Sequence, residues 1–403
     1  MLHRLPLIGF MVLMLVGFGC APKKIAPISP EDNPQHHYLQ GMLSLEKGDI
    51  ETGMGKFKRA LKLNKKFSPG LAGMSLALAM RAQGQAEVKY READVSEALN
   101  YLKKARKKAK EKNEKFIYYT TAIRVYTHAR SNDWLKKAED AFRDAWAIEE
   151  ASTQNLPYYQ EKEAAAYFMG QAYLAAYLFR EAEDKFAVVL SEKPEGKWQP
   201  LANKAYQKVQ KIMRATAHYT IGNVAQKIAV KEIVNRADVA ALLVDEIKLD
   251  KLFAGRIPIE SEIAAMRPEF IPADLANSPF KSEIMTVLKW NLRGLEPQYD
   301  ETSRAFLFGP QNPVRRKELA LALEDILIKL IGSERLATEY IGTEHSPFPD
   351  VDSTAPWFNA AITVTSRGLM EPELSGEFRP DDYADGAELL LAVFKLRHVL
   401  NIH

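Results

Sequence analysis

Cysteine is almost absent from this chain: one residue among 403. A single cysteine excludes an intramolecular disulfide and every zinc or iron–sulfur site that needs several thiolates. An excess of charge of one sign is also lacking, because 55 basic side chains face 52 acidic ones and the net charge is +3. That balance gives no general reason to expect nucleic acid as a partner. With 47% hydrophobic residues the chain is too apolar to be disordered, and its length predicts two or three domains.

Motifs of catalysis and of cofactor binding are missing as well. The nearest match to a nucleophile elbow, around Ser75, lies inside a predicted helix, where no sharp turn exposes the hydroxyl. The sequence contains no zinc-protease motif and no phosphate-binding glycine loop. Of the eight histidines only His36 and His37 are adjacent, and neighbours on a helix point to different faces. The sequence therefore predicts no catalytic residue, no metal site and no cofactor, and the protein is not expected to be an enzyme.

The first twenty residues have the organisation of a secretory signal. A short basic start, Met1 to Arg4, precedes an apolar run from Leu5 to Phe18 that is too short to span a bilayer comfortably. The run is followed by Gly19 and by Cys20, the sole cysteine. This arrangement resembles the bacterial lipoprotein signal, in which a small residue precedes the cysteine that receives the lipid. The alternative is an ordinary signal peptide with a cysteine at this place by chance.

The lipoprotein resemblance implies a signal peptide over residues 1–19 and a mature chain that begins at a lipidated Cys20. Ala21 and Pro22 follow, with no aspartate after the cysteine, and in the family this implies sorting to the outer membrane of a Gram-negative cell. Several prolines make residues 20–33 an extended tether. The expected location is the cell envelope, where acyl chains hold the protein on the outer membrane, facing the periplasm or the cell surface.

Residues 34–214 carry a recurring small–large–small pattern with spacings of four and three. Those spacings place three residues on one helical face, where small residues admit a neighbouring helix and the large one fills the gap. The pattern reads Gly53-Phe57-Ala60, Ala98-Leu102-Ala105, Ala138-Phe142-Ala145 and Ala182-Phe186-Val189. It resembles the tetratricopeptide repeat, which implies a helical solenoid with a groove for a protein partner. A generic helical bundle is the alternative.

Two segments of the C-terminal third can be laid over each other. One runs from Asp274-Leu275 through Gly294-Leu295 and Phe308-Gly309-Pro310 to Glu318, and the other from Asp350-Val351 through Gly368-Leu369 and Phe378-Arg379-Pro380 to Glu388. The proline precedes the glutamate by eight residues in both, and an apolar helix follows. The pattern resembles the S-layer homology (SLH) domain, whose three repeats form a pseudo-threefold unit. The residues around Val234 to Ala240 suggest a third, abbreviated copy, of which only the helix-start part of the motif can be recognised.

The SLH resemblance divides this region into residues 215–252, 270–331 and 346–400, the first, second and third copies. It implies a mostly α fold, in which the tetratricopeptide-like solenoid precedes an α-helical pseudo-threefold module. In the family an arginine at the helix start projects into a groove between repeats and contacts anionic cell-wall glycan. Arg236 and Arg316 match that arginine, and Phe280 and Trp357 match the aromatic position, so these four are the expected glycan-binding residues. Surface or intramolecular salt-bridge roles are the alternative for both arginines.

Local chemistry accounts for other residues of the motif. Asn235, Glu318 and Glu388 stand where a helix cap and a first-turn acid belong, and the aspartate can close a turn before the aromatic residue. The third copy departs from the pattern, because Gly386 takes the arginine position and Asp385 precedes it. This departure puts a third groove in doubt, since negative charge disfavours an acidic polymer.

Together these resemblances favour a non-enzymatic lipoprotein that tethers the outer membrane to the cell wall. Lipid on Cys20 would anchor it, residues 215–400 would bind peptidoglycan or a linked cell-wall polymer, and residues 34–214 would recruit an unidentified protein. One alternative is a scaffold for envelope assembly or polysaccharide export, in which the SLH-like copies are only structural. Another is a cell-wall glycan hydrolase that uses scattered carboxylates.

Overall fold

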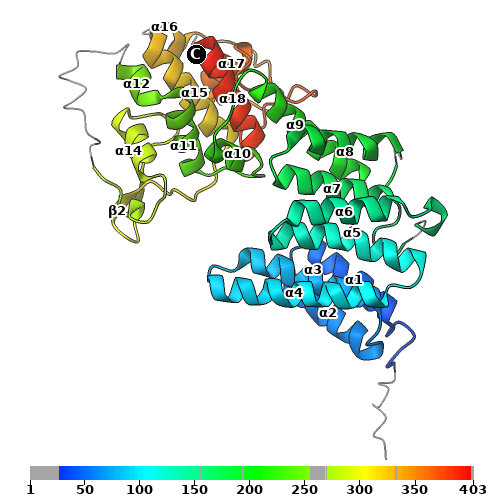
Figure 1. Cartoon of the computed structure of the whole chain (residues 1–403). Helices are drawn as coiled ribbons and strands as arrows, with labels where there is room; N and C mark the ends of the chain where they lie inside the picture. The colour runs from blue at the N-terminus through cyan, green and yellow to red at the C-terminus, as the bar shows by residue number, and fades with distance from the viewer. Residues whose placement is uncertain are drawn as a thin grey trace, which may run out of the picture. The chain divides into compact units, whose positions relative to one another are not determined.

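The computed structural model describes residues 27–153, 156–192, 195–254, 268, 270–331 and 334–400. These residues are mostly helical, and the named strands among them form one two-stranded hairpin (Figure 1). The mostly α fold class is therefore confirmed. The chain divides into two compact units, residues 1–121 and 122–403, and the division falls inside a helix rather than at residue 214.

The first unit is built from helix pairs joined by short turns. Its helices are α1 (Pro34–Glu46), α2 (Ile50–Leu63), α3 (Ser68–Gly84), α4 (Val88–Lys108) and the start of α5 (Lys112–Ala129). Two of them begin at side-chain caps: Asn33 accepts a hydrogen bond from the His36 N–H, and Asp49 accepts one from the Thr52 N–H. Such caps satisfy a first-turn N–H that has no partner inside its own helix.

The small–large–small pattern explains how these helices pack. Phe57 of α2 is fully buried, and its ring lies against glycines of the two neighbouring helices. A Cβ on Gly41 of α1 would stand 2.5 Å from a ring carbon, and a Cβ on Gly73 of α3 would clash with the same ring. Because interiors are close-packed, a larger residue at either glycine would push the helices apart. Burial of Gly53, Phe57 and Ala60 confirms the face predicted for α2.

The second unit opens with the rest of α5 and four more helices. These are α6 (Trp134–Trp146), α7 (Glu163–Ala175), α8 (Phe179–Glu192) and α9 (Gln199–Thr216), with a 3₁₀ turn, η1 (Glu150–Ser152), before α7. α7 and α8 pack like α1 and α2, since a Cβ on Gly170 would stand 2.6 Å from the Phe186 ring. Contacts from α6 to α9 run between helices that follow each other in the chain, as in a solenoid. Membership of the tetratricopeptide family stays a prediction.

The C-terminal module lies in the same unit, and its three copies share one buried core. The first copy contains α10 (Asn223–Ala229), α11 (Arg236–Ile247) and α12 (Leu249–Ala254). The second contains the 3₁₀ turn η2 (Ala273–Leu275), α14 (Lys281–Lys289), the antiparallel strands β1 (Gln298–Asp300) and β2 (Ala305–Leu307), α15 (Arg316–Ile331) and α16 (Glu334–Thr338). The third contains α17 (Phe358–Ser366) and α18 (Gly386–Val399).

A closed ring of main-chain hydrogen bonds joins the three copies just before α11, α15 and α18. Val314 donates its N–H to the Val234 carbonyl at 3.0 Å, Val234 to the Ala384 carbonyl at 3.0 Å, and Ala384 to the Val314 carbonyl at 2.9 Å. All three residues are buried. Since each holds the same place in its copy and bonds in the same sense, the module is pseudo-threefold at its centre. The three helices that start from this ring lie together in Figure 1.

The last helix of the array, α9, packs onto the module. It contacts α18, and Arg214 near its end pairs with Glu371 of the third copy at 3.1 Å. Lys208 is buried and donates to the carbonyls of Val230 and Lys231 at 3.0 and 2.9 Å. A buried ammonium group needs such partners because desolvation without them is costly. Residue 214, the predicted domain edge, lies within α9, which contacts α18. The predicted domain bounds stay a prediction.

Candidate functional site

Arg236, the first residue of α11, is 5% exposed and points into the protein. Its Nε donates to the Phe308 carbonyl at 2.7 Å, Nη2 to the Glu296 carbonyl at 2.8 Å and Nη1 to the Gly294 carbonyl at 3.2 Å. Its Cζ lies 4.7 Å from the centroid of the Phe308 ring, which adds a cation–π contact. Arg236 of the first copy therefore holds the loop of the second.

Arg316, the first residue of α15, repeats this arrangement one copy further along. It is 1% exposed, and it donates to the Phe378 carbonyl at 2.7 Å and to the Glu371 carbonyl at 3.0 Å. It also forms an ion pair with Glu388 of α18. Burial lowers the pKa of Arg316 to about 10, so the guanidinium stays charged at neutral pH. Arg316 of the second copy thus holds the loop of the third.

These positions correct the expectation that both arginines project into an open groove. A guanidinium presents five N–H donors in a rigid fork, which suits several carbonyls at once, and a buried one must be satisfied in this way. The contacts support the intramolecular alternative for Arg236 and Arg316. Direct contact of either guanidinium with a glycan stays untested.

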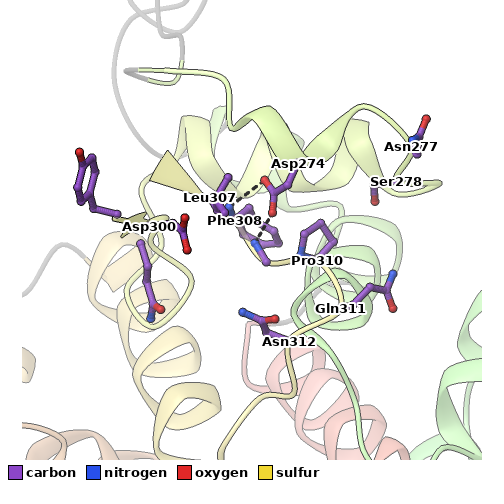
Figure 2. A pocket seen from close by; sticks show the side chains of 12 residues that line it. Asp274, Asn277, Ser278, Asp300, Leu307, Phe308, Pro310, Gln311 and Asn312 are labelled. Carbon is purple, nitrogen blue, oxygen red and sulfur yellow. Dashed lines mark hydrogen bonds between the residues drawn. The ribbon is translucent and has the colours of Figure 1, made fainter. Parts of the chain in front are cut away.

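The aspartates of the second and third copies have partners that the sequence analysis missed. Asp274 accepts hydrogen bonds from the Phe308 and Gly309 N–H groups at 3.1 and 2.7 Å, drawn as dashed lines in Figure 2. Asp350 accepts from the Phe378 and Arg379 N–H groups at 2.9 and 2.6 Å. A local turn was expected, yet each carboxylate binds a loop 28 to 35 residues further along the chain. Arginine and aspartate together fix both the carbonyls and the N–H groups of the same loop.

Gly386 has a structural reason to replace arginine in the third copy. It is the first residue of α18 and faces the last two residues of α10 in the first copy. A Cβ here would overlap the Ile228 carbonyl oxygen and stand 2.8 Å from the carbonyl carbon, while the Gly386 N–H donates to the Lys231 carbonyl at 3.0 Å. Asp385 caps α18 by accepting from the Glu388 N–H at 2.9 Å. The third position therefore closes the module tightly and has no room for a long side chain.

Phe280 and Trp357 occupy equivalent places, immediately before α14 and α17, and both pack half-buried against the core. Their surroundings differ. Lys317 of α15 places its Nζ 4.4 Å from the Trp357 ring centroid and 2.6 Å from the Asp381 carboxylate. The buried indole N–H of Trp357 has no hydrogen-bond acceptor among the described residues. The structure thus pairs Trp357 with Lys317. The sequence analysis did not single out Lys317, whose only distinguishing feature in the sequence is its position next to Arg316.

We name the surface around Trp357 the third-copy patch and define it as Arg315, Lys317, Trp357, Arg379 and Tyr383. Arg315 donates to the Asp381 carbonyl at 2.6 Å, and its Cζ lies 5.3 Å from the Tyr383 ring centroid. The hydrogen bond from Lys317 lowers the pKa of Asp381. Every cation of the patch has a carboxylate nearby, so an anionic polymer would have to compete for them.

Arg379 of this patch has an unfavourable backbone conformation. Its φ is +57°, and Gly309, at the same place in the second copy, has a φ of +66°. A left-handed conformation suits glycine and costs roughly 1–2 kcal/mol for other residues. The Arg379 side chain pairs with Glu373 at 2.8 Å and with Asp382 at 3.2 Å. The third copy thus places a cation where the second keeps a glycine.

A cleft of about 670 Å³ opens in the second copy (Figure 2). It is bordered by the hairpin of β1 and β2, by the loop from Phe308 to Asn312, and by residues that begin the copy at Asp274. The hairpin arises from a longer connection, since Phe308 follows Gly294 by 14 residues whereas Phe378 follows Gly368 by ten. The hairpin side of this cleft therefore has no counterpart in the third copy.

The described ranges contain neither a cluster of metal-ligating side chains nor a membrane-spanning helix. Within them no group of three or more His, Cys, Asp and Glu side chains is arranged to hold a metal ion. None of the helices described there has both the length and the apolar character needed to cross a membrane. Cys20, the predicted lipid acceptor, lies outside the described residues together with the predicted signal peptide.

Comparison with known families finds an S-layer homology domain at residues 347–390. This stretch holds Asp350, Trp357 and the start of α18. None of the curated proteins and none of the solved structures compared with the chain matches it. An SLH domain is a non-catalytic module that binds cell-wall polymers; it supports attachment to the cell wall or envelope and implies a location in a bacterial cell envelope.

Proposed function

We propose that the protein is a non-enzymatic lipoprotein that attaches the outer membrane to a cell-wall polymer, with the third-copy patch as the polymer site. The observation that carries this proposal is the pairing of Trp357 and Lys317 at the edge of the SLH domain. A half-buried aromatic ring offers an apolar face to a sugar ring, while the neighbouring charged groups reach its hydroxyls.

The strained Arg379 gives independent support. A non-glycine residue in the left-handed region persists when the surroundings fix it, and such residues cluster at functional sites. Here the Arg379 N–H is fixed by Asp350, and the side chain pairs with Glu373 and Asp382. A glycine would fulfil the backbone requirement better, so the retained guanidinium fits a role in binding.

Retention of the full chain on purified sacculi tests this proposal. We expect Trp357→Ala and Lys317→Gln each to weaken retention at least tenfold, a loss of about 1.4 kcal/mol, because each removes one side of the sugar site. Trp357→Phe keeps the packing against the core and should retain part of the binding. Lys281→Gln, on the exposed start of α14, is the matched control for loss of one positive charge and should bind like the parent. Unchanged retention of a folded Trp357→Ala protein would remove the patch from the proposal.

The scaffold alternative predicts the opposite outcome, that changes in the patch leave wall retention as it was. Exchanges of Arg236 or Arg316 do not discriminate between the two, because both residues are buried and support the fold. The same incubation also tests the hydrolase alternative, since soluble glycan fragments in the supernatant would show cleavage. The full chain is used because α9 packs against α18.

The lipid anchor and the protein partner complete the proposal. We expect the mature protein to begin at Cys20 with a mass raised by its acyl chains, as read by mass spectrometry of the N-terminal peptide. Confinement near the wall raises the effective concentration of polymer, so weak binding by the patch suffices. Cys20→Ser should appear in the soluble envelope fraction. An unmodified N-terminus on a chain that washes freely from envelopes would disprove the anchor.

The helical array of residues 34–214 is proposed to hold the protein partner.

A further inference from the structure

The cleft of the second copy is lined by groups that suit an uncharged ligand. Four residues with side-chain amides border it, Asn277, Gln298, Gln311 and Asn312, together with Ser278. The Gln311 amide oxygen accepts a hydrogen bond from the Asn235 amide at 3.1 Å. Among the described residues, those that line the cleft include no lysine, arginine or histidine. An amide both donates and accepts hydrogen bonds, which matches neighbouring hydroxyls of a sugar.

Two carboxylates give the cleft its charge. Asp274 accepts from the Phe308 and Gly309 N–H groups, and Asp300 accepts from the N–H and the hydroxyl of Ser303 at 2.6 and 2.8 Å. The hydrogen bonds from Ser303 lower the pKa of Asp300, so its carboxylate is ionised at neutral pH. Figure 2 shows Asp274 and Asp300 on different sides of the cleft. Their negative charge favours hydroxyl donors and repels a carboxylate or phosphate ligand.

The cleft has a gap that only glycine permits, and the aromatic rings of the bordering hairpin lie on the face that points away from it. Tyr299 is 56% exposed, and its ring packs edge-on against Phe306 with 5.3 Å between centroids. Gly309 allows the Asn312 amide to come close, because a Cβ at that position would clash with the Asn312 side chain. In the third copy Arg379 takes the place of Gly309 and the hairpin is missing. The two copies therefore present different chemistry: an amide-lined acidic cleft in one and a cationic aromatic patch in the other.

We infer that the cleft of the second copy binds an uncharged sugar unit, a hexose or an N-acetylhexosamine, and discriminates against uronic acids. The amides pair with ring hydroxyls, and the carboxylates of Asp274 and Asp300 accept hydrogen bonds from hydroxyl donors of the sugar. The inference rests on the proposed function only for the biological source of the sugar, which would be the same wall polymer that contacts the third-copy patch.

The test is a titration of the full chain, carrying ring-labelled tyrosine, with N-acetylglucosamine and with glucuronic acid at pH 7. The Tyr299 ring signal, assigned with Tyr299→Phe, reports on the hairpin that borders the cleft and not on the surface around Trp357. We expect N-acetylglucosamine to shift it saturably with a Kd in the millimolar range, and glucuronic acid to bind at least tenfold more weakly. Gln298→Ala and Asn277→Ala should each raise the Kd about threefold or more, as loss of one hydrogen bond does.

Asp300→Asn separates charge from shape. It keeps the side-chain size and should let glucuronic acid bind within about threefold of N-acetylglucosamine, because the repulsion is reduced. Glu301→Gln removes a carboxylate from the exposed turn of the same hairpin, outside the cleft lining, and should leave the discrimination as in the parent. Equal binding of the two sugars to the parent, absence of a saturable Tyr299 shift, or an unchanged Kd in both Gln298→Ala and Asn277→Ala would overturn the inference. Retention on sacculi through Trp357 is measured in a separate experiment. The sugar-binding inference and the proposed wall attachment can therefore fail independently of each other.

Discussion

Arg316→Ala is expected to destabilise the C-terminal module by about 3–5 kcal/mol, because removal of one partner leaves a buried charge uncompensated. The uncompensated group is Glu388, itself buried, and the Phe378 and Glu371 carbonyls lose their donors at the same time. Hydrogen exchange of peptides from α15 and α18 measures the effect. Since each 1.4 kcal/mol is a factor of ten, amides that open with the module should exchange roughly 10²- to 4 × 10³-fold faster.

Three further variants separate the buried network from general effects of charge. Arg315→Ala changes the neighbouring, partly exposed arginine and should cost less than about 1 kcal/mol, as exposed ion pairs do. Arg316→Lys keeps the charge but not the planar fork and should fall between parent and alanine. The double variant Arg316→Met with Glu388→Gln removes both charges and should regain part of the lost stability. Exchange rates in Arg316→Ala within a factor of five of the parent would show that the arginine does not hold the copies together.

The sequence predicted the parts of this protein that depend on interactions between residues close together in the chain. Asn235 accepts a hydrogen bond from the Asp238 N–H at 2.8 Å, as a cap in this position should. The small–large–small spacing predicted the buried face of α2 for the same reason, since helical periodicity is local. In each case the residues that interact lie within one helical turn or on one face of one helix.

The parts that the sequence did not predict depend on contacts between copies. The direction of the Arg236 side chain is set by carbonyls 58 to 72 residues away, and the partners of Asp274 lie 34 and 35 residues away. Motif spacing places a residue at a helix start, but it does not say whether the side chain turns toward solvent or toward the next loop. The cleft was missed because the longer connection in the second copy was visible only as a difference in length.

Gly386→Ala is expected to destabilise the module by about 3 kcal/mol or more, the upper range for overpacking, because the obstacle is main chain. The added Cβ would overlap the Ile228 carbonyl oxygen and stand 2.9 Å from the Ala229 carbonyl carbon, neither of which can rotate away. The hydrogen bond from the Gly386 N–H to Lys231 would be displaced with it. Exchange rates of amides in α10 and α18 measure the change.

The sign of this effect is the decisive point, because glycine to alanine in a helix ordinarily stabilises. Gly55 of α2 is the matched control: nothing lies within 4 Å of a Cβ built there, and Gly55→Ala should stabilise by roughly 0.5–1 kcal/mol. Gly386→Arg restores the residue that the other two copies carry, yet it should destabilise at least as much as alanine, since the first copy offers no loop for a guanidinium to hold. A stable, well-folded Gly386→Arg protein would mean that the third copy does not close against the first, and that the ring through Val234, Val314 and Ala384 opens in solution.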